Sequence, residues 1–219
     1  MKTFKVLSSL LAYPEPALLA HTEELAEALA GEDLLPAANR RALGEFLTYL
    51  AGLDPLEAQE RYVALFDRNR SLSLHLYEHV HGESRDRGQA MVQLGEIYRL
   101  HGVEIDAHEL PDYLPLFLEF LSMLPLKAVA SLLSEGVHVI AALQERLVER
   151  ASPYAAVMGA IAALAAKPAE RTAIEEVLAM LKPEADSPEA LDRQWEEEAV
   201  RFTAAGGPDQ TAVASGCGR

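Results

Sequence analysis

The feature that most restricts the fold of this chain is a helical spacing of apolar residues, repeated in successive segments and interrupted by prolines and glycines. Near the start, Phe4, Leu7 and Leu10 recur every third residue, an interval that places side chains on one face of an α-helix. Pro14 and Pro16 then end this segment, because proline lacks a backbone donor and restricts the residue before it. The recurrence predicts an all-α fold.

Further segments share this pattern and are predicted helices. They cover roughly residues 17–30, 36–51, 55–66, 73–81, 85–101, 109–124, 126–150, 153–167 and 174–181. Asp54 is predicted to cap the helix that follows it. In that helix we expect Leu56 to face the core and Glu57 to complete a capping box. Ser84 and Ser152 are predicted to cap two later helices.

Length and composition indicate one folded body followed by a looser end. With 219 residues, half of them apolar, the chain can bury about 70% of the surface that its unfolded form exposes. Pro168 breaks the helical pattern, and an amphipathic helix and an acidic segment containing Trp195 follow it. We predict a single-domain helical bundle at 1–167, an accessory C-terminal helix and acidic segment at 168–205, and a flexible, disordered tail at 206–219.

Charge and cysteine content exclude several kinds of partner. The formal net charge is −15, which repels a phosphate backbone, so no nucleic acid is expected to bind. The single cysteine, Cys217, allows neither an intramolecular disulfide nor a cysteine-based metal site, as expected in the cytoplasm. Ser8 and Ser9 interrupt the first apolar run, so we expect no signal peptide. No run approaches the roughly 18 apolar residues that cross a bilayer, so no integral membrane segment is expected.

Histidines, charges of both signs and aromatic residues crowd together between residues 75 and 124, so function is sought there first. The pattern His75-x-x-Glu78-His79 matches inverted zinc proteases, in which two histidines on one helix face bind zinc and the glutamate activates water. No spacing rule selects a third ligand among the nearby candidates, His81, Glu83 and Glu119. The alternative to a zinc-dependent hydrolase is that these histidines lie at a helix end. The sequence contains no glycine-rich nucleotide-binding loop.

A second hypothesis for the same stretch is recognition of a peptide. Glu109 and Asp112 precede an unusually apolar segment, and Tyr77 and Tyr113 are available beside it. Polar helix ends, tyrosines and an apolar helix together are typical of a peptide-binding groove. The structural alternative is that Glu109 and Asp112 cap a helix that starts at Pro111.

Four segments of the chain carry a family resemblance. They read YVALFD (62–67), EHVHGESRDRGQAM (78–91), ELPDYLPLFLEFLS (109–122) and WEEEAVRF (195–202). In these four segments the chain closely resembles the NarJ family, the respiratory nitrate reductase molybdenum-cofactor assembly chaperones. The resemblance covers most of the chain, and the segment at 78–91 is its most specific part.

The resemblance implies an all-helical fold of the TorD-like type, no catalysis and no cofactor of the protein's own. Members of the NarJ family bind the apo catalytic subunit of respiratory nitrate reductase, including its N-terminal peptide, in the cytoplasm. They permit insertion of the molybdenum cofactor and an iron–sulfur centre before membrane docking. The implied partner is therefore the molybdenum-binding catalytic subunit, and cofactor-delivery proteins are further candidates. TorD-like relatives carry an acidic-Pro-x-Asp-His type motif in the client-binding region, and residues 109–113 match it with Tyr113 in place of histidine.

We therefore predict a client-peptide groove in this stretch, with apolar anchors and an acidic rim suited to a basic, amphipathic peptide. Replacing Asp112 by alanine is expected to weaken peptide binding without unfolding the protein. The predicted client-binding residues are Tyr77, His79, His81, Glu83, Arg85, Asp86, Glu109, Pro111, Asp112, Tyr113, Pro115 and Glu119.

Overall fold

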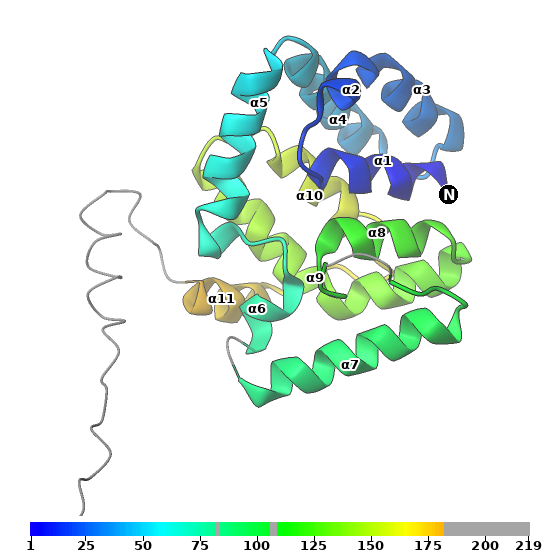
Figure 1. Ribbon diagram of the computed structural model, residues 1–219, viewed down its shortest axis with the longest axis vertical. Helices are drawn as coiled ribbons and strands as arrows, with labels where there is room; N and C mark the ends of the chain where they lie inside the picture. Colours follow the sequence, from blue (N-terminus) through cyan, green and yellow to red (C-terminus); the bar gives the residue numbers. More distant parts are fainter. Residues whose placement is uncertain (82–83, 106–108, 182–219) are drawn as a thin grey trace, which may run out of the picture. The chain divides into compact units, whose positions relative to one another are not determined.

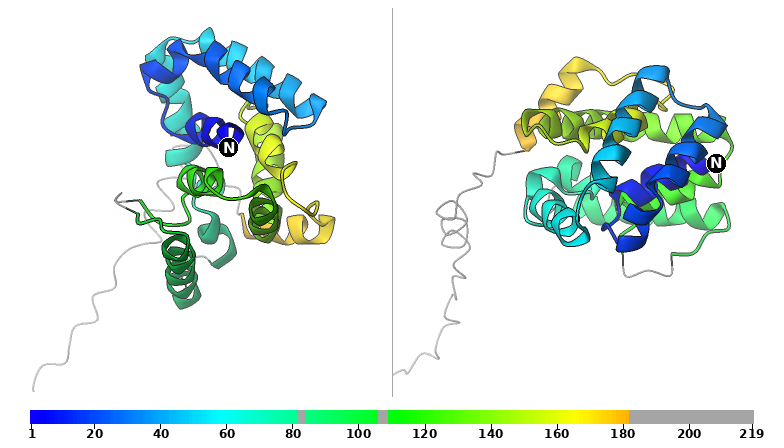
Figure 2. Two further views of the ribbon diagram at one scale, coloured as in Figure 1. Left: turned by 90° about the vertical axis from the view of Figure 1, so that its right-hand side faces the viewer. Right: turned by 90° about the horizontal axis from the view of Figure 1, so that it is seen from above.

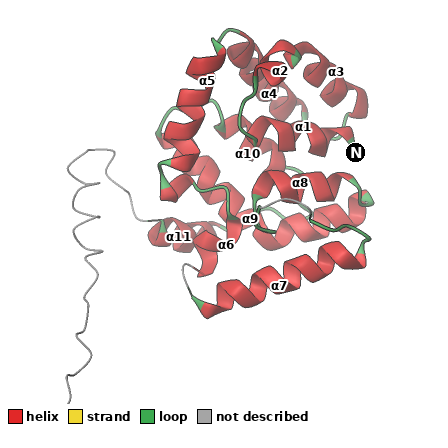
Figure 3. Ribbon diagram, viewed as in Figure 1, coloured by secondary structure: helices red, strands yellow, loops and turns green. Residues whose placement is uncertain are grey.

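The computed structural model describes residues 1–81, 84–105 and 109–181 of the 219-residue chain. These residues form helices joined by turns and loops, with no strand among them (Figure 3). The predicted all-α class is thereby confirmed. The described residues belong to one compact unit, Met1–Glu184. The predicted acidic segment and tail lie outside the described residues.

Eleven α-helices lie within the described residues (Figure 1). They are α1 (Lys2–Leu11), α2 (Pro16–Ala20), α3 (Thr22–Glu32), α4 (Ala37–Ala51), α5 (Pro55–Tyr62), α6 (Leu76–His81), α7 (Arg85–Leu100), α8 (Leu114–Ser122), α9 (Leu126–Glu149), α10 (Ala155–Ala162) and α11 (Arg171–Met180). A single π-helical turn, Val63–Asp67, continues α5, and a 3-10 turn, Arg70–Leu72, follows it.

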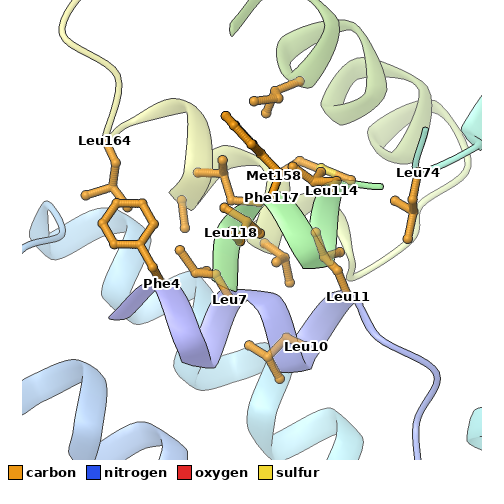
Figure 4. Packing of buried hydrophobic residues seen from close by; sticks show 14 of the residues in the cluster. Phe4, Leu7, Leu10, Leu11, Leu74, Leu114, Phe117, Leu118, Met158 and Leu164 are labelled. Carbon is orange, nitrogen blue, oxygen red and sulfur yellow. The ribbon is translucent and has the colours of Figure 1, made fainter. Parts of the chain in front are cut away.

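The first helix, α1, lies in the middle of the hydrophobic core and packs against α8. Figure 4 shows Leu7 and Leu11 of α1 facing Leu114 and Leu118 of α8. All four side chains are fully buried, and burying a leucine contributes roughly 1.5–3 kcal/mol. The hydroxyl of Ser8 also donates to a backbone carbonyl of α8 at 2.7 Å. These contacts fix the position of α8, which carries part of the site described below.

Glu32, at the end of α3, fastens the start of α1. Its two carboxylate oxygens accept the backbone N–H groups of Lys2 and Thr3 at 2.6 and 2.7 Å. Burial raises the pKa of the Glu32 carboxyl, but the hydrogen bonds to the two backbone N–H groups lower it by more. The pKa therefore lies below its ordinary value. The free amides at a helix start are thus satisfied by a side chain distant in sequence.

The longest helix, α9, contacts α6, α10 and α11. It is long and apolar enough to cross a membrane by length and composition alone, so the expectation that no segment reaches this threshold was too strict. In the structure, Val129, Leu133, Ile140 and Leu143 of α9 are buried in the core. Core helices of helical bundles pass the same test, which therefore gives weak support for a membrane segment.

The end of α11 is held on α9 by one arginine. Arg146 donates to the carbonyl oxygens of Leu178 and Leu181 at 3.2 and 3.0 Å. Carbonyls at a helix end have no partner within the helix, so this side chain satisfies two of them. By contrast, α7 lies along the outside of the described bundle in Figure 1 and in the left view of Figure 2, with Leu94 and Tyr98 as its buried residues.

The prediction of one helix over residues 17–30 was wrong, because the chain breaks at His21. The backbone there leaves the α region, with φ −116° and ψ 22°, and its N–H bonds the carbonyl of Leu18 at 3.2 Å. This three-residue step interrupts the α-helical hydrogen-bond pattern. The chain changes direction between α2 and α3, and Leu29 of α3 reaches the core.

Several predicted helix starts differ from the structure. Asp54 does cap α5, since its side chain accepts the N–H of Leu56 at 2.9 Å. Leu56 itself is 64% exposed, contrary to prediction, and Glu57 pairs with Arg61 and forms no capping box. Ser152 does not cap α10, because its buried hydroxyl has no partner and the helix begins later.

The helix predicted from residue 109 begins at Leu114. Neither Glu109 nor Asp112 caps it, and Tyr113 occupies the position before its first residue. Ser84 does precede the first residue of α7, although its side chain makes no capping bond. Glu109 and Asp112 therefore do not cap α8, contrary to prediction. Asp112 forms other hydrogen bonds, which are described below.

Candidate functional site

A cavity of about 320 Å³ lies where three segments of the chain meet. The segments are the end of α5 with its π-helical turn, the stretch leading into α6, and the residue before α8. The lining residues are Tyr62, Phe66, Asp67, Arg70, Ser73, Leu74, His75, Glu78 and Tyr113. Three of the four segments that carry the family resemblance thus contribute to one place or adjoin it.

The stretches before α6 and α8 are joined by a short antiparallel bridge between His75 and Tyr113. Leu76 donates its N–H to the carbonyl of Asp112 at 3.1 Å, and Leu114 donates to the carbonyl of Leu74 at 2.8 Å. The rings of His75 and Tyr113 lie with their centroids 5.4 Å apart. The bridge therefore holds the two sides of the cavity at a fixed separation.

Asp112 supports this bridge from beneath and is fully buried. One carboxylate oxygen accepts the backbone N–H of Tyr77 at 3.0 Å, and the other accepts from Nδ1 of His75 at 3.2 Å. Because Tyr77 is the second residue of α6, Asp112 caps that helix from 35 residues away. The hydrogen bond to Asp112 is the main cause that raises the pKa of His75 above its ordinary value.

Ser73, Glu78 and His79 form a second set of bonds around the start of α6. The Ser73 hydroxyl donates to Glu78 Oε2 at 2.7 Å and accepts the N–H of His75 at 3.3 Å. The carbonyl of Ser73 can only accept, so Nε2 of His79 donates to it at 2.7 Å. Burial lowers the pKa of His79, despite this bond. His79 is therefore a buried imidazole whose burial favours the neutral form, and it fixes the turn into α6.

These bonds bear directly on the alternative of a zinc-dependent hydrolase. Nε2 of His79 and one oxygen of Glu78 are already engaged by Ser73, and Nδ1 of His75 is engaged by Asp112. Within the ranges that the structure describes, no three histidine, cysteine or acidic side chains gather closely enough to hold a metal ion. His75 therefore joins the start of α6 to the segment before α8, whereas Glu78 and His79 hold the turn into α6.

Aromatic residues form one wall of the cavity. The Tyr62 hydroxyl donates to the carbonyl of Leu11 at 2.8 Å. Because the only hydroxyl proton of Tyr62 is donated in this bond, Tyr62 accepts a hydrogen bond from the hydroxyl of Tyr113, 3.4 Å away. The rings of Tyr62 and Phe66 lie 5.0 Å apart, and burial raises the pKa of both tyrosines. The wall is thus apolar in its rings, and its hydroxyls are occupied.

The π-helical turn places Phe66 and Asp67 at the cavity. Single π-helical turns are rare and occur often at functional sites. The side chain of Asp67 is exposed, and its carboxylate makes no hydrogen bond or ion pair with any described residue. Partial desolvation raises the pKa of this carboxyl group.

Tyr113 alone among the predicted client-binding residues lines this cavity. His79, Asp112 and Pro115 are buried, and the first two hold neighbouring backbone groups in place. Contact of these three residues with the client stays a prediction.

The other predicted residues lie around the site. Pro111 accepts the hydroxyl of Tyr98 at 2.7 Å, and the rings of Tyr77 and His81 lie 5.7 Å apart on α6. The exposed residues are Arg85, Asp86, Glu109 and Glu119, and Glu83 lies outside the described residues.

Sequence reasoning missed most of the cavity lining: Tyr62, Phe66, Asp67, Arg70, Ser73 and Leu74. The first three belong to the segment YVALFD, which carries the family resemblance but follows a helical apolar pattern and therefore indicates core packing. The polar residues after it indicate an ordinary loop. Only the meeting of this segment with α6 and α8 identifies it as part of a site.

Comparison with known proteins identifies the family. The family model described as "Nitrate reductase delta subunit" matches residues 32–159, more than half of the chain and all of the cavity lining. The chain belongs to the nitrate reductase delta subunit family.

Two relatives from Escherichia coli match more than nine tenths of this chain, and one from Bacillus subtilis matches 70% of it. NarJ of Escherichia coli K12, a nitrate reductase molybdenum cofactor assembly chaperone, is 44% identical over 208 residues, which are 95% of this chain and 88% of NarJ. NarW of the same strain, described as a probable chaperone of the same kind, is 39% identical over 92% of this chain and 84% of its own. NarJ of Bacillus subtilis 168, also described as probable, is 31% identical over 70% and 82%. The resemblance seen in the sequence is confirmed.

Proposed function

We propose that this delta subunit family member is an assembly chaperone for a respiratory nitrate reductase. It binds the apo catalytic subunit in the cytoplasm, including that subunit's N-terminal peptide. Binding permits insertion of the molybdenum cofactor and an iron–sulfur centre before the enzyme docks at the membrane. The observation that carries the proposal is the 44% identity to E. coli NarJ over 95% of this chain.

The geometry of the site supports binding in preference to catalysis. The one serine that lines the cavity, Ser73, gives its proton to Glu78 and not to an imidazole, so no serine–histidine nucleophile pair is formed. The pair of His75 and Asp112 is used to join α6 to α8. Groups that hold the walls of a cavity in place favour a preformed recognition site.

The acidic character of the chain supports a basic client segment. The net charge is −15; the exposed residue Glu109 precedes the apolar helix α8, and the exposed residue Glu119 belongs to it. Charges at the rim of an interface act mainly on the association rate and its salt dependence, whereas apolar anchors supply most of the affinity. We therefore place the client peptide along the surface between Glu109 and α8, with the cavity beneath one part of it.

Titration calorimetry with the N-terminal peptide of the catalytic subunit tests the proposal. We expect saturable binding with a dissociation constant in the micromolar range or below, weakened by added salt. A scrambled peptide of the same composition is the control, because it retains the net charge. Absence of heat and of any electrophoretic mobility shift at micromolar concentrations would refute the proposal.

A second measurement addresses assembly itself. When the gene for this chain is deleted from its host, the nitrate reductase purified from the membrane should contain less molybdenum, and restoring the gene should restore the metal. An enzyme with its full metal content in the deletion strain would contradict the proposed role.

A further inference from the structure

We propose that Asp67 makes the cavity a subsite for one cationic side chain of the client peptide, preferably an arginine. The inference rests on the proposed function, which supplies the peptide, and it adds which part of the peptide is read and by which residue. Asp67 is not among the residues predicted from the sequence to bind the client. The structure assigns it through its position, its lack of a partner and its aromatic neighbours.

The size of the cavity fits a side chain. Pockets for small molecules have volumes of about 300–1,000 Å³, and the cavity, at about 320 Å³, lies at the lower end of that range. A helical or extended peptide backbone needs a groove that continues beyond such a volume. One long side chain reaching down from a peptide on the surface is an occupant of suitable size.

The charges around the cavity favour a cation. Two carboxylates, Asp67 and Glu78, and one guanidinium, that of Arg70, line it. His75 also lines it, but the buried carboxylate of Asp112 lies against that ring, so the His75–Asp112 pair is neutral or negative in either protonation state. The lining is therefore net negative whether or not His75 is protonated.

Asp67 is the carboxylate best placed to receive the ligand. One oxygen of Glu78 is already bonded to Ser73, whereas Asp67 has no partner among the described residues. The side chain of Asp67 is exposed, so a cation from outside the protein can reach it. A bound cation would also offset the partial desolvation that raises the pKa of this carboxyl group.

The aromatic wall favours arginine over lysine. Tyr62, Phe66 and Tyr113 all line the cavity, and the face of an aromatic ring attracts a cation within about 6 Å. The planar guanidinium can stack on such a face while its N–H groups bond a carboxylate in the same plane. The compact ammonium of lysine has no planar surface to stack on a ring and cannot present two N–H groups side by side in one plane to a carboxylate.

A double-mutant cycle tests the subsite. Each arginine of the client's N-terminal peptide is replaced in turn by citrulline, which has nearly the same shape but no charge, and each lysine by norleucine. Every peptide is titrated against the unaltered protein, Asp67→Asn, and the control Glu27→Gln. Glu27 is an exposed acidic residue of α3, which contributes no residue to the cavity, so its replacement measures the effect of net charge alone.

We expect Asp67→Asn to weaken binding of the unmodified peptide about tenfold and Glu27→Gln to leave it nearly unchanged. For one citrulline peptide, the Asp67→Asn variant should bind as tightly as the unaltered protein, because the interaction is already lost. Equal affinity of the unaltered protein and Asp67→Asn for the unmodified peptide would overturn the subsite while leaving the proposed function in place.

A probe that is independent of the client separates the remaining outcomes. Nα-acetyl-argininamide and its citrulline analogue are titrated while the ring signals of His75 and Tyr113 are followed by NMR. If the client peptide fails to bind the unaltered protein, the proposed function is refuted, and this titration alone decides the subsite. Saturable shifts with the arginine compound that disappear in Asp67→Asn support it, and equal responses to both compounds overturn it.

Discussion

Replacing Asp112 by alanine should destabilise the whole protein. The Asp112 carboxylate is fully buried and holds two groups at once, the N–H of Tyr77 and Nδ1 of His75. Loss of a helix-capping side chain costs about 1 kcal/mol. Loss of a hydrogen bond between charged or polarised groups costs roughly 1.5–3 kcal/mol. We therefore expect a decrease of about 3 kcal/mol in the free energy of unfolding, out of the roughly 5–15 kcal/mol typical of a folded domain.

Urea denaturation followed by circular dichroism measures this decrease, and thermal melting should show a decrease in Tm of about 6–12 °C for a chain of this length. Asp112→Asn is the matched control. Its amide oxygen can still accept the N–H of Tyr77, so we expect it to lose about half as much as Asp112→Ala. Peptide binding to either variant must be compared at a temperature where the variant is folded.

The pH dependence of this effect follows from His75. Its pKa is raised in the folded protein, first by the hydrogen bond to Asp112. The resulting stabilisation is fully present below the unfolded pKa of His75, near 6.5, and is lost as the pH rises through the higher folded value. Asp112→Ala should therefore cost more at pH 5.5 than at pH 9. An unchanged unfolding midpoint, or an equal loss at both pH values, would refute this account of Asp112.

Three further replacements test other contacts of the fold by urea denaturation. Glu32→Ala should cost about 1–2 kcal/mol through loss of the α1 cap, and less as the pH falls through the lowered pKa of Glu32; a constant cost down to pH 2 would contradict this. Tyr62→Phe should cost about 1 kcal/mol through the lost bond to Leu11, and an equally stable variant would show that this bond contributes nothing. Arg146→Met should release the end of α11, so amide hydrogen exchange there should become faster while exchange in α1 stays unchanged. Equal exchange rates at the end of α11 in the variant and the unaltered protein would contradict this role of Arg146.

The order and type of the helices could be predicted from sequence because prolines and apolar spacing are local signals. The break at His21 could not, since it depends on how α2 and α3 turn to reach the core. The exposure of Leu56 likewise depends on which neighbours cover the start of α5, and helical spacing alone does not specify them.

The candidate site was predicted only in part. The stretch from residue 75 to 124 does hold one side of it, and Tyr113 does line the cavity. The role of Asp112 could not be read locally, because the helix that it caps begins 36 positions earlier at Leu76. Asp67 was missed because its significance comes from having no partner, which only the folded arrangement reveals.

The antiparallel bridge between His75 and Tyr113 also bears on the order in which the chain folds. The adjoining hydrogen bond between His75 and Asp112 joins residues that are 37 positions apart. A loop that contains the whole of α7 must therefore close before the cavity exists. Closing such a loop costs entropy that the winding of single helices does not. During translation, the cavity can form only after Tyr113 has left the ribosome, so any ligand of the cavity can bind only after that point.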